Sequence, residues 1–205
     1  PFLKIKSYLD SDEFGYFCST VIPGPQTVHT IHFSKEIRKS YSHIKIIWGG
    51  YFASNQHEVV VRSGYVDYVV NGPGDIALPS LLEALAKNTP FHDIENLVFE
   101  RDGKIVRTLK ADLIDQDQLP DLPYDTLNKF YSIEGYLGKT FLGTRTAAYH
   151  SSIGCPFTCS FCGVVPIFEA RWKGKSAERI YRDLIFLKQN YGINAFNFHD
   201  NNFFV

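Results

Sequence analysis

Three of the four cysteines lie within one short stretch, Gly154-Cys155-Pro156-Phe157-Thr158-Cys159-Ser160-Phe161-Cys162-Gly163. Thiolates are strong ligands for iron and zinc, and closely spaced thiolates on one loop can hold an iron–sulfur cubane. Three protein ligands leave one iron of a cubane open, so that a bidentate small molecule can bind it. A disulfide framework would spread its cysteines apart, so this spacing favours a metal site in a reducing compartment.

Two other metal sites could use the same cysteines. Three cysteines and one histidine can hold zinc in tetrahedral geometry, and the available imidazoles are His150 and His199. Both fall in predicted strands without the spacing of a zinc finger, which weakens that hypothesis. A ferredoxin-like electron carrier normally uses four cysteines per cluster, and the fourth would have to be the distant Cys18. Cys18 lies in an apolar stretch, where we expect a buried core thiol.

The elements that must position these cysteines indicate an α/β protein, because short apolar runs alternate with helical patterns. In the first half we expect strands at 14–19, 44–48 and 66–70, helices at 27–39, 58–63 and 76–87, a hairpin at 96–108 and a linker at 111–127. In the second half we expect a strand at 144–152, the cysteine loop, a helix at 177–189 and a strand at 193–199. Ser176 and Gly192 suit the two ends of that helix.

The C-x3-C-x2-C spacing, with an aromatic residue before the last cysteine and a strand before the loop, resembles the radical S-adenosylmethionine (SAM) superfamily. The resemblance implies that Cys155, Cys159 and Cys162 hold a [4Fe-4S] cluster whose open iron binds SAM. Electron transfer from such a cluster cleaves SAM to a 5'-deoxyadenosyl radical, which abstracts hydrogen from the substrate. The strand–loop–helix–strand order from Thr144 onwards is similar to the start of that family's barrel.

The same resemblance places four further residues near SAM: Phe161, Gly163, Asp200 and Asn202. Phe161 matches the aromatic residue that lies near the adenine. Asp200 and Asn202 belong to the sequence His199-Asp200-Asn201-Asn202-Phe203, and related proteins have an Asp-rich, Phe-ended sequence at the same barrel strand. The alternative for this sequence is a polar strand end that only caps a loop. No residue is assigned as an acid, base or nucleophile.

Glycines follow the predicted strands of the first half, in Trp48-Gly49-Gly50-Tyr51-Phe52-Ala53-Ser54 and in Val66 to Asp75. These stretches resemble the cobalamin-binding domain found before many radical SAM barrels. Glycines allow close approach of a ligand to the backbone, and open α/β sheets bind ligands beyond the carboxyl ends of their strands. The predicted cobalamin-binding residues are Ser19, Thr20, Gly49, Gly50, Gly72 and Gly74.

That domain departs from the family pattern in three places. Gly72-Pro73-Gly74-Asp75 replaces the usual Gly-Glu-Gly-Glu, and Phe52 stands where a histidine often occurs. The Asp-x-His-x-x-Gly motif, whose histidine ligates cobalt in some relatives, is absent from the sequence. The sequence therefore does not identify the lower ligand of a bound corrinoid. The alternative interpretation is a Rossmann-like scaffold that has lost the corrinoid.

The predicted fold class is therefore α/β, with an N-terminal Rossmann-like parallel sheet followed by the start of a radical SAM partial (β/α) barrel. We expect a cobalamin-binding-like domain at 1–92, a hairpin and linker at 93–140, and the first part of a radical SAM domain at 141–205. The chain contains no Met and its ends fall inside structured patterns, so we expect an internal fragment of a longer protein.

The leading hypothesis is a cobalamin-dependent radical SAM enzyme that performs methyl transfer or an oxidative cyclisation resembling the anaerobic chlorophyll-ring cyclase. Its partners would be a small-molecule substrate, which the sequence does not identify, and an external electron donor of the flavodoxin or ferredoxin type. The alternatives are a methylthiotransferase-like radical SAM enzyme, disfavoured by the lack of further cysteines, and a non-catalytic corrinoid or metal-binding module. The formal net charge of -1 and the lack of a long apolar run predict a soluble, cytoplasmic protein without nucleic-acid or membrane partners.

Overall fold

The computed structural model describes residues 2–11 and 13–205, so that the first residue and residue 12 of the expected first domain lie outside the described part. The chain divides into two compact units, Pro1–Asp112 and Leu113–Val205. Each is treated by itself below. None of the described helices is long and apolar enough to cross a membrane.

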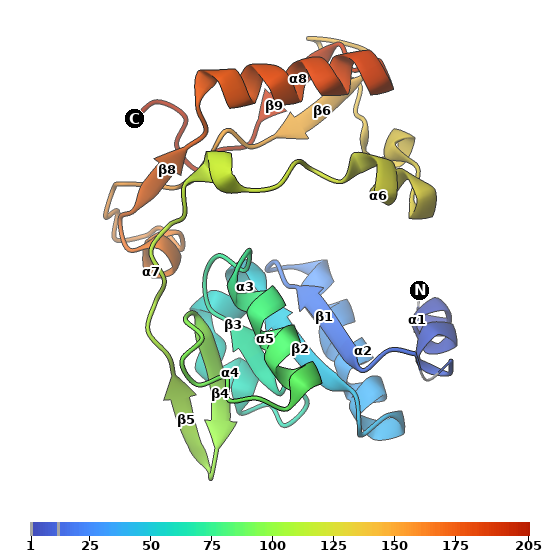
Figure 1. Ribbon diagram of the computed structural model, residues 1–205, viewed down its shortest axis with the longest axis vertical. Helices are drawn as coiled ribbons and strands as arrows, with labels where there is room; N and C mark the ends of the chain where they lie inside the picture. Colours follow the sequence, from blue (N-terminus) through green and yellow to red (C-terminus); the bar gives the residue numbers. More distant parts are fainter. Residues whose placement is uncertain (1, 12) are drawn as a thin grey trace. The chain divides into compact units, whose positions relative to one another are not determined.

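Unit 1 is built on a five-stranded sheet in the order β1-β2-β3-β4-β5, in which β1, β2 and β3 are parallel and β4 and β5 are antiparallel (Figure 1). Its strands are β1 (Tyr16–Thr20), β2 (Lys45–Gly49), β3 (Tyr68–Val70), β4 (Leu97–Arg101) and β5 (Lys104–Arg107). Its helices are α1 (Phe2–Leu9), α2 (Pro25–Ser40), α3 (Gly50–Asn55), α4 (His57–Val61) and α5 (Ala77–Lys87).

Helices cover both faces of this sheet, because neighbouring strand residues point to opposite sides. On one face Ile46 and Trp48 of β2 pack with residues of α2, α3 and α4. On the other face Ile47 of β2 and Val70 of β3 pack against Leu81 of α5. This two-sided burial explains why the inner strands read as continuous apolar runs rather than alternating ones.

Unit 2 contains two small sheets, a parallel pair β6–β9 and an antiparallel pair β7–β8. Its strands are β6 (Thr146–Tyr149), β7 (Ser152–Gly154), β8 (Trp172–Gly174) and β9 (Ala195–Phe198). Its helices are η1 (Gln116–Gln118), α6 (Tyr124–Phe130), η2 (Ile133–Tyr136), α7 (Val165–Phe168) and α8 (Ala177–Tyr191). Helix α8 covers one face of β6–β9, where Leu187 packs with Ala147, Tyr149 and Ile193.

The structure confirms the α/β class and the parallel-rich first sheet. Helix α8 begins and ends as predicted: the Ser176 side chain accepts a hydrogen bond from Arg179 N, and Gly192 adopts a left-handed conformation after the last turn. The stripe of apolar residues on this helix packs toward the strands as expected.

Other elements differ from the sequence-based expectations. The hairpin, expected to follow the first domain, extends its sheet, because Phe99 of β4 pairs with Tyr68 of β3. The hairpin accordingly lies in the first compact unit, which ends at Asp112. The single strand expected at 144–152 is two strands, β6 and β7, and β7 pairs with the unpredicted β8. Helices α1, α3, α6 and α7 were not predicted either.

Candidate cofactor sites

The cysteine loop leaves β7 at a point that only glycine can occupy. Gly154 has φ +81°, and a Cβ on it would lie 2.1 Å from the carbonyl oxygen of Arg171. The next amide, that of Cys155, donates to the same carbonyl at 3.0 Å. The first cysteine is therefore held at the junction of β7 and the segment that leads into β8.

The three thiols lie on one open loop. Cys155 and Cys162 are half-buried and Cys159 is exposed. The amide of Cys162 donates to the carbonyl of Cys159 at 3.0 Å, so that the chain turns back between these two residues. Phe161, expected near the adenine of SAM, is 91% exposed, and Gly163 lies on the exposed end of the same turn.

Among the described residues, no three His, Cys, Asp or Glu side chains converge as they would around a single metal ion. His150 and His199, the histidines available to a zinc site, lie just after β6 and β9 with their rings 6.1 Å apart at 84°. A mononuclear zinc site needs four ligands at one point, whereas the irons of a cubane lie at separate corners.

Asp200 lies where β9 ends and is fixed by two buried hydroxyl groups. Ser151 Oγ donates to Asp200 Oδ1 at 3.0 Å, and Ser152 Oγ donates to the same oxygen at 2.5 Å. The other carboxylate oxygen, Oδ2, is buried and has no hydrogen-bond partner within the described part of the chain. Burial raises the pKa of Asp200, but the hydrogen bonds from Ser152 and Ser151 outweigh it, so the net pKa is below its ordinary value.

Asn202, predicted to lie near SAM, lies beside the first cysteine of the loop. Its side-chain nitrogen lies 3.9 Å from Cys155 Sγ, and its carbonyl oxygen accepts a hydrogen bond from Trp172 Nε1 at 3.1 Å and lies 3.3 Å from Ser152 Oγ. Sequence reasoning missed Ser151, Ser152 and Trp172 because no motif surrounds them. The only sequence signal for Ser151 and Ser152 was that two serines stand next to each other just before the cysteine loop.

The six residues predicted for cobalamin line one groove of about 300 Å³ beyond the carboxyl ends of β1, β2 and β3. They are Ser19, Thr20, Gly49, Gly50, Gly72 and Gly74, and the groove also takes in Cys18, Ile47, Val70 and Leu78. Parallel strands end at the same edge, which explains why positions so far apart in the chain meet. No histidine is among the described residues that line the groove.

Two details give this groove its shape. Gly50 has φ +84°, and a Cβ on it would lie 2.8 Å from Thr20 Cγ2 and 3.0 Å from Val21 N, so any larger residue would push against the end of β1, where Thr20 lines the groove. The loop at Gly72 is fixed from behind, because Ser54 Oγ accepts from its amide at 3.1 Å and Asn96 Nδ2 donates to the carbonyl of Pro73 at 3.2 Å.

The expectation that Cys18 is a buried core residue is wrong. Cys18 is exposed on β1, which is an edge strand of the sheet. It pairs in register with Ile47 and shares the face that α5 covers, but α5 packs over the inner strands and leaves this end open. The thiol still lies in the concave wall of the groove, where desolvation by its neighbours raises the pKa of Cys18.

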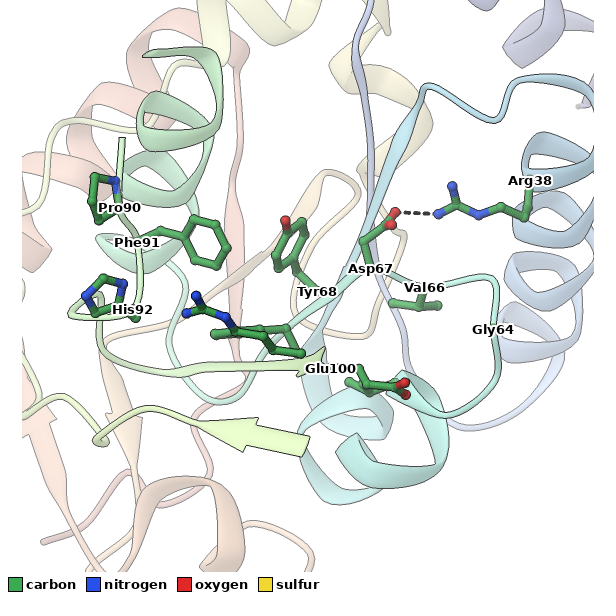
Figure 2. Close-up of a pocket in the computed structure, with 12 residues that line it drawn as sticks. Arg38, Gly64, Val66, Asp67, Tyr68, Pro90, Phe91, His92 and Glu100 are labelled. Atoms are coloured by element: carbon green, nitrogen blue, oxygen red, sulfur yellow. Dashed lines mark hydrogen bonds and ion pairs between the residues drawn. The ribbon is translucent and has the colours of Figure 1, made fainter. Parts of the chain in front are cut away.

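A second and larger cavity, about 750 Å³, lies at the opposite end of β3 (Figure 2). Figure 2 shows Arg38 paired with Asp67 on one side and the rings of Tyr68 and Phe91 on the other. The rings of Tyr68 and Phe91 pack edge to face, with their centroids 5.4 Å apart. The half-buried guanidinium of Arg38 is already paired with the carboxylate of Asp67.

No protein-family model matches the sequence. The chain is 26% identical over 168 residues to an anaerobic magnesium-protoporphyrin IX monomethyl ester cyclase of Synechocystis, covering 81% of this chain and 32% of the relative. It is 30% identical over 203 residues to an uncharacterized methyltransferase of Pyrococcus horikoshii, covering 98% of this chain and 42% of the relative. The chain thus spans less than half the length of these curated relatives.

Among solved structures, the fold is similar to the cobalamin-dependent SAM radical enzyme OxsB with aqua-cobalamin and SAM bound. The TM-score is 0.74 at 18% identity, over 99% of this chain and 28% of that one. The similarity to OxsB supports the fold, and the similarity in sequence to the cyclase and the methyltransferase supports homology. The chain is therefore a homologue of the anaerobic cyclase and of the methyltransferase, and it has the fold of the cobalamin-dependent SAM radical enzyme OxsB.

Proposed function

We propose that this chain is part of a radical SAM enzyme that holds a [4Fe-4S] cluster on Cys155, Cys159 and Cys162. The observation that carries the proposal is three accessible thiols on one loop that starts beside the ends of β6 and β9. When bound, such a cluster supplies one electron for breaking a sulfur–carbon bond of SAM, which gives methionine and a 5'-deoxyadenosyl radical.

The residues around the loop divide the task of holding SAM. Asp200 presents an unpaired, buried carboxylate oxygen while Ser151 and Ser152 occupy the other one. A buried acceptor without a partner is costly, and the ammonium group of SAM would satisfy it. Phe161 is 91% exposed and thus available to pack against an adenine ring.

Anaerobic reconstitution with iron and sulfide tests the cluster. About four irons and four sulfides per chain are expected, and Cys159→Ala should remove the cluster. Cys18→Ala is the matched control, since Cys18 is exposed in the other unit, and it should keep a full cluster. Tightly bound zinc without sulfide, or loss of the cluster in Cys18→Ala, would contradict the assignment and favour a zinc module or a four-cysteine carrier.

We further propose that the groove of unit 1 binds cobalamin. Its support is the convergence of all six predicted residues, together with a floor of glycines that admits a bulky ligand close to the backbone. Retention of the cobalamin absorbance after gel filtration is the expected result. Repeated loss of cobalamin from correctly folded protein would favour the scaffold that has lost its corrinoid.

The reaction proposed for the whole protein is methyl transfer or oxidative cyclisation of a small molecule, with electrons from a flavodoxin- or ferredoxin-type donor. With cobalamin bound, methyl transfer is the version that uses both units directly. A methylthiotransferase would need a second cluster, so a count of eight irons per chain would favour that alternative. Protein that loads cobalamin and iron yet never cleaves SAM would favour the non-catalytic module.

A further inference from the structure

The side chain of Asn202 contacts one of the three cysteines of the loop. The amide nitrogen of Asn202 lies 3.9 Å from Cys155 Sγ, within the range of a hydrogen bond to sulfur. We propose that Asn202 is a positioning residue that donates an N–H···S hydrogen bond to the Cys155 thiolate and thereby sets the reduction potential of the cluster. This inference rests on the proposed function.

The backbone of Asn202 is held in place from two strands. Trp172 Nε1 donates to the carbonyl oxygen of Asn202 at 3.1 Å, and Ser152 Oγ lies 3.3 Å from the same oxygen. Ser152 belongs to β7 and Trp172 to β8, and these strands pair so that Trp172 is opposite Gly154. Cys155 directly follows Gly154, so one two-stranded ribbon fixes both partners of the N–H···S contact.

Local sequence around Trp172 supports this geometry. A Cβ on Gly174 would lie 2.7 Å from the ring of Trp172, so glycine at this position leaves room for the indole to fold back over its own strand. The indole is half-buried, and the carbonyl of Asn202 satisfies its N–H group. The contact between Asn202 and Cys155 is thus part of a packed arrangement rather than a chance approach of two exposed side chains.

The effect on the cluster follows from charge. Reduction adds an electron to a group whose sulfur ligands already carry negative charge, and an N–H donor to a ligand sulfur stabilises the reduced state more than the oxidised state. Asn202 therefore raises the potential, and removal of its donor lowers it. Roles at the end of β9 divide accordingly: Asp200, with its unpaired oxygen, faces the ligand, and Asn202 faces the cluster.

The test is the midpoint potential of the reconstituted cluster, followed by electron paramagnetic resonance during a redox titration. Asn202→Ala removes the donor, and Asn202→Asp keeps the shape but replaces the N–H group with an anionic oxygen. Both should shift the potential to more negative values, by about tenfold in the redox equilibrium, or about 59 mV for a one-electron couple. Trp172→Phe, which frees the carbonyl of Asn202, should shift it in the same direction by less.

Asn190→Asp is the matched control, because it adds the same charge at the far end of α8, where the side chain of Asn190 is exposed and donates to the carbonyl of Phe186. Its potential should equal that of the unmodified chain. Iron and sulfide are counted first: absence of a cluster from the unmodified chain would overturn the proposed function itself. A full cluster with an unchanged potential in both Asn202 variants would overturn this inference alone. If Asn202→Ala fails to hold a cluster, the midpoint potential of the isosteric Asn202→Asp variant decides whether the inference holds.

Discussion

The guanidinium of Arg179 donates to the carbonyl oxygen of Leu119 at 2.8 Å, although 60 positions separate the two residues. Further donors reach the carbonyls of Pro120 at 3.1 Å and Asp117 at 3.3 Å, while Nε pairs with Asp183 at 3.1 Å. The Arg179 side chain is only 5% exposed. Helix α8 therefore binds three backbone carbonyls of the entering segment of unit 2 through one buried cation.

We expect Arg179→Met to destabilise unit 2 by about 3 kcal/mol, because it leaves buried carbonyls and the Asp183 carboxylate with fewer partners. Urea unfolding followed by circular dichroism measures this. Arg182→Met is the control: Arg182 pairs with Asp121, but its side chain is 61% exposed, so the loss should stay below about 1 kcal/mol. Equal losses in the two variants would show that the buried hydrogen bonds contribute nothing specific.

Gly154→Ala should disrupt the start of the cysteine loop. The left-handed φ and the collision with the Arg171 carbonyl both act on the residue before Cys155, and strain of this kind costs about 1–3 kcal/mol or more. We expect lower unfolding stability and less iron per chain after reconstitution. Gly135→Ala, where the added Cβ meets nothing within 4 Å, should retain both. Full iron loading in Gly154→Ala would mean that the loop tolerates a shifted entry.

Gly50→Ala should weaken cobalamin retention, because the added Cβ would push against the end of β1, where Thr20 lines the groove. Gly64→Ala is matched to it, because Gly64 also has a left-handed conformation, at φ +77°, but its Cβ would meet open space. Both variants carry the conformational cost of a side chain at positive φ, about 1 kcal/mol. Only Gly50→Ala should lose the absorbance of bound cobalamin on gel filtration, and equal loss in both would point to general destabilisation.

Ser152→Ala should make unit 2 less stable at neutral pH, by about 1 kcal/mol, because the charged form of Asp200 loses a hydrogen bond. The pKa of Asp200 is lowered in the folded chain, so its contribution is present above the unfolded pKa of about 4 and is lost as the pH falls through the folded value. The variant raises the folded pKa, so its difference from the unmodified chain should shrink toward pH 3.

Unfolding measured at several pH values tests this, with Ser160→Ala as the control because Ser160 is exposed in the same unit. That control should match the unmodified chain throughout. A difference between Ser152→Ala and the unmodified chain that stays constant from pH 7 to pH 3 would indicate lost packing rather than a lost bond to the carboxylate.

The sequence by itself determined what local patterns control. Apolar runs and helical periodicity located β2, α2, α5 and α8, and Ser176 and Gly192 marked the ends of α8 correctly. The groove residues of unit 1 could be named in advance because parallel strands end at one edge, so glycines after successive strands must meet there. The cysteine spacing was also visible in the sequence, because all three thiols lie on one short loop.

Only the tertiary structure decided the features that depend on distant partners. Residues 150 and 151 break the expected strand because β7 pairs with β8, which local propensity does not reveal. Cys18 is exposed because α5 packs over the inner strands, and the apolar stretch around Cys18 does not determine which strands that helix covers. Asn202 faces Cys155 because Trp172 and Ser152 hold its backbone, and Arg179 is buried because a segment far away in the chain folds over it. Local sequence fixes periodicity and turns, whereas burial and hydrogen-bond partners across long chain separations follow only from how the elements pack.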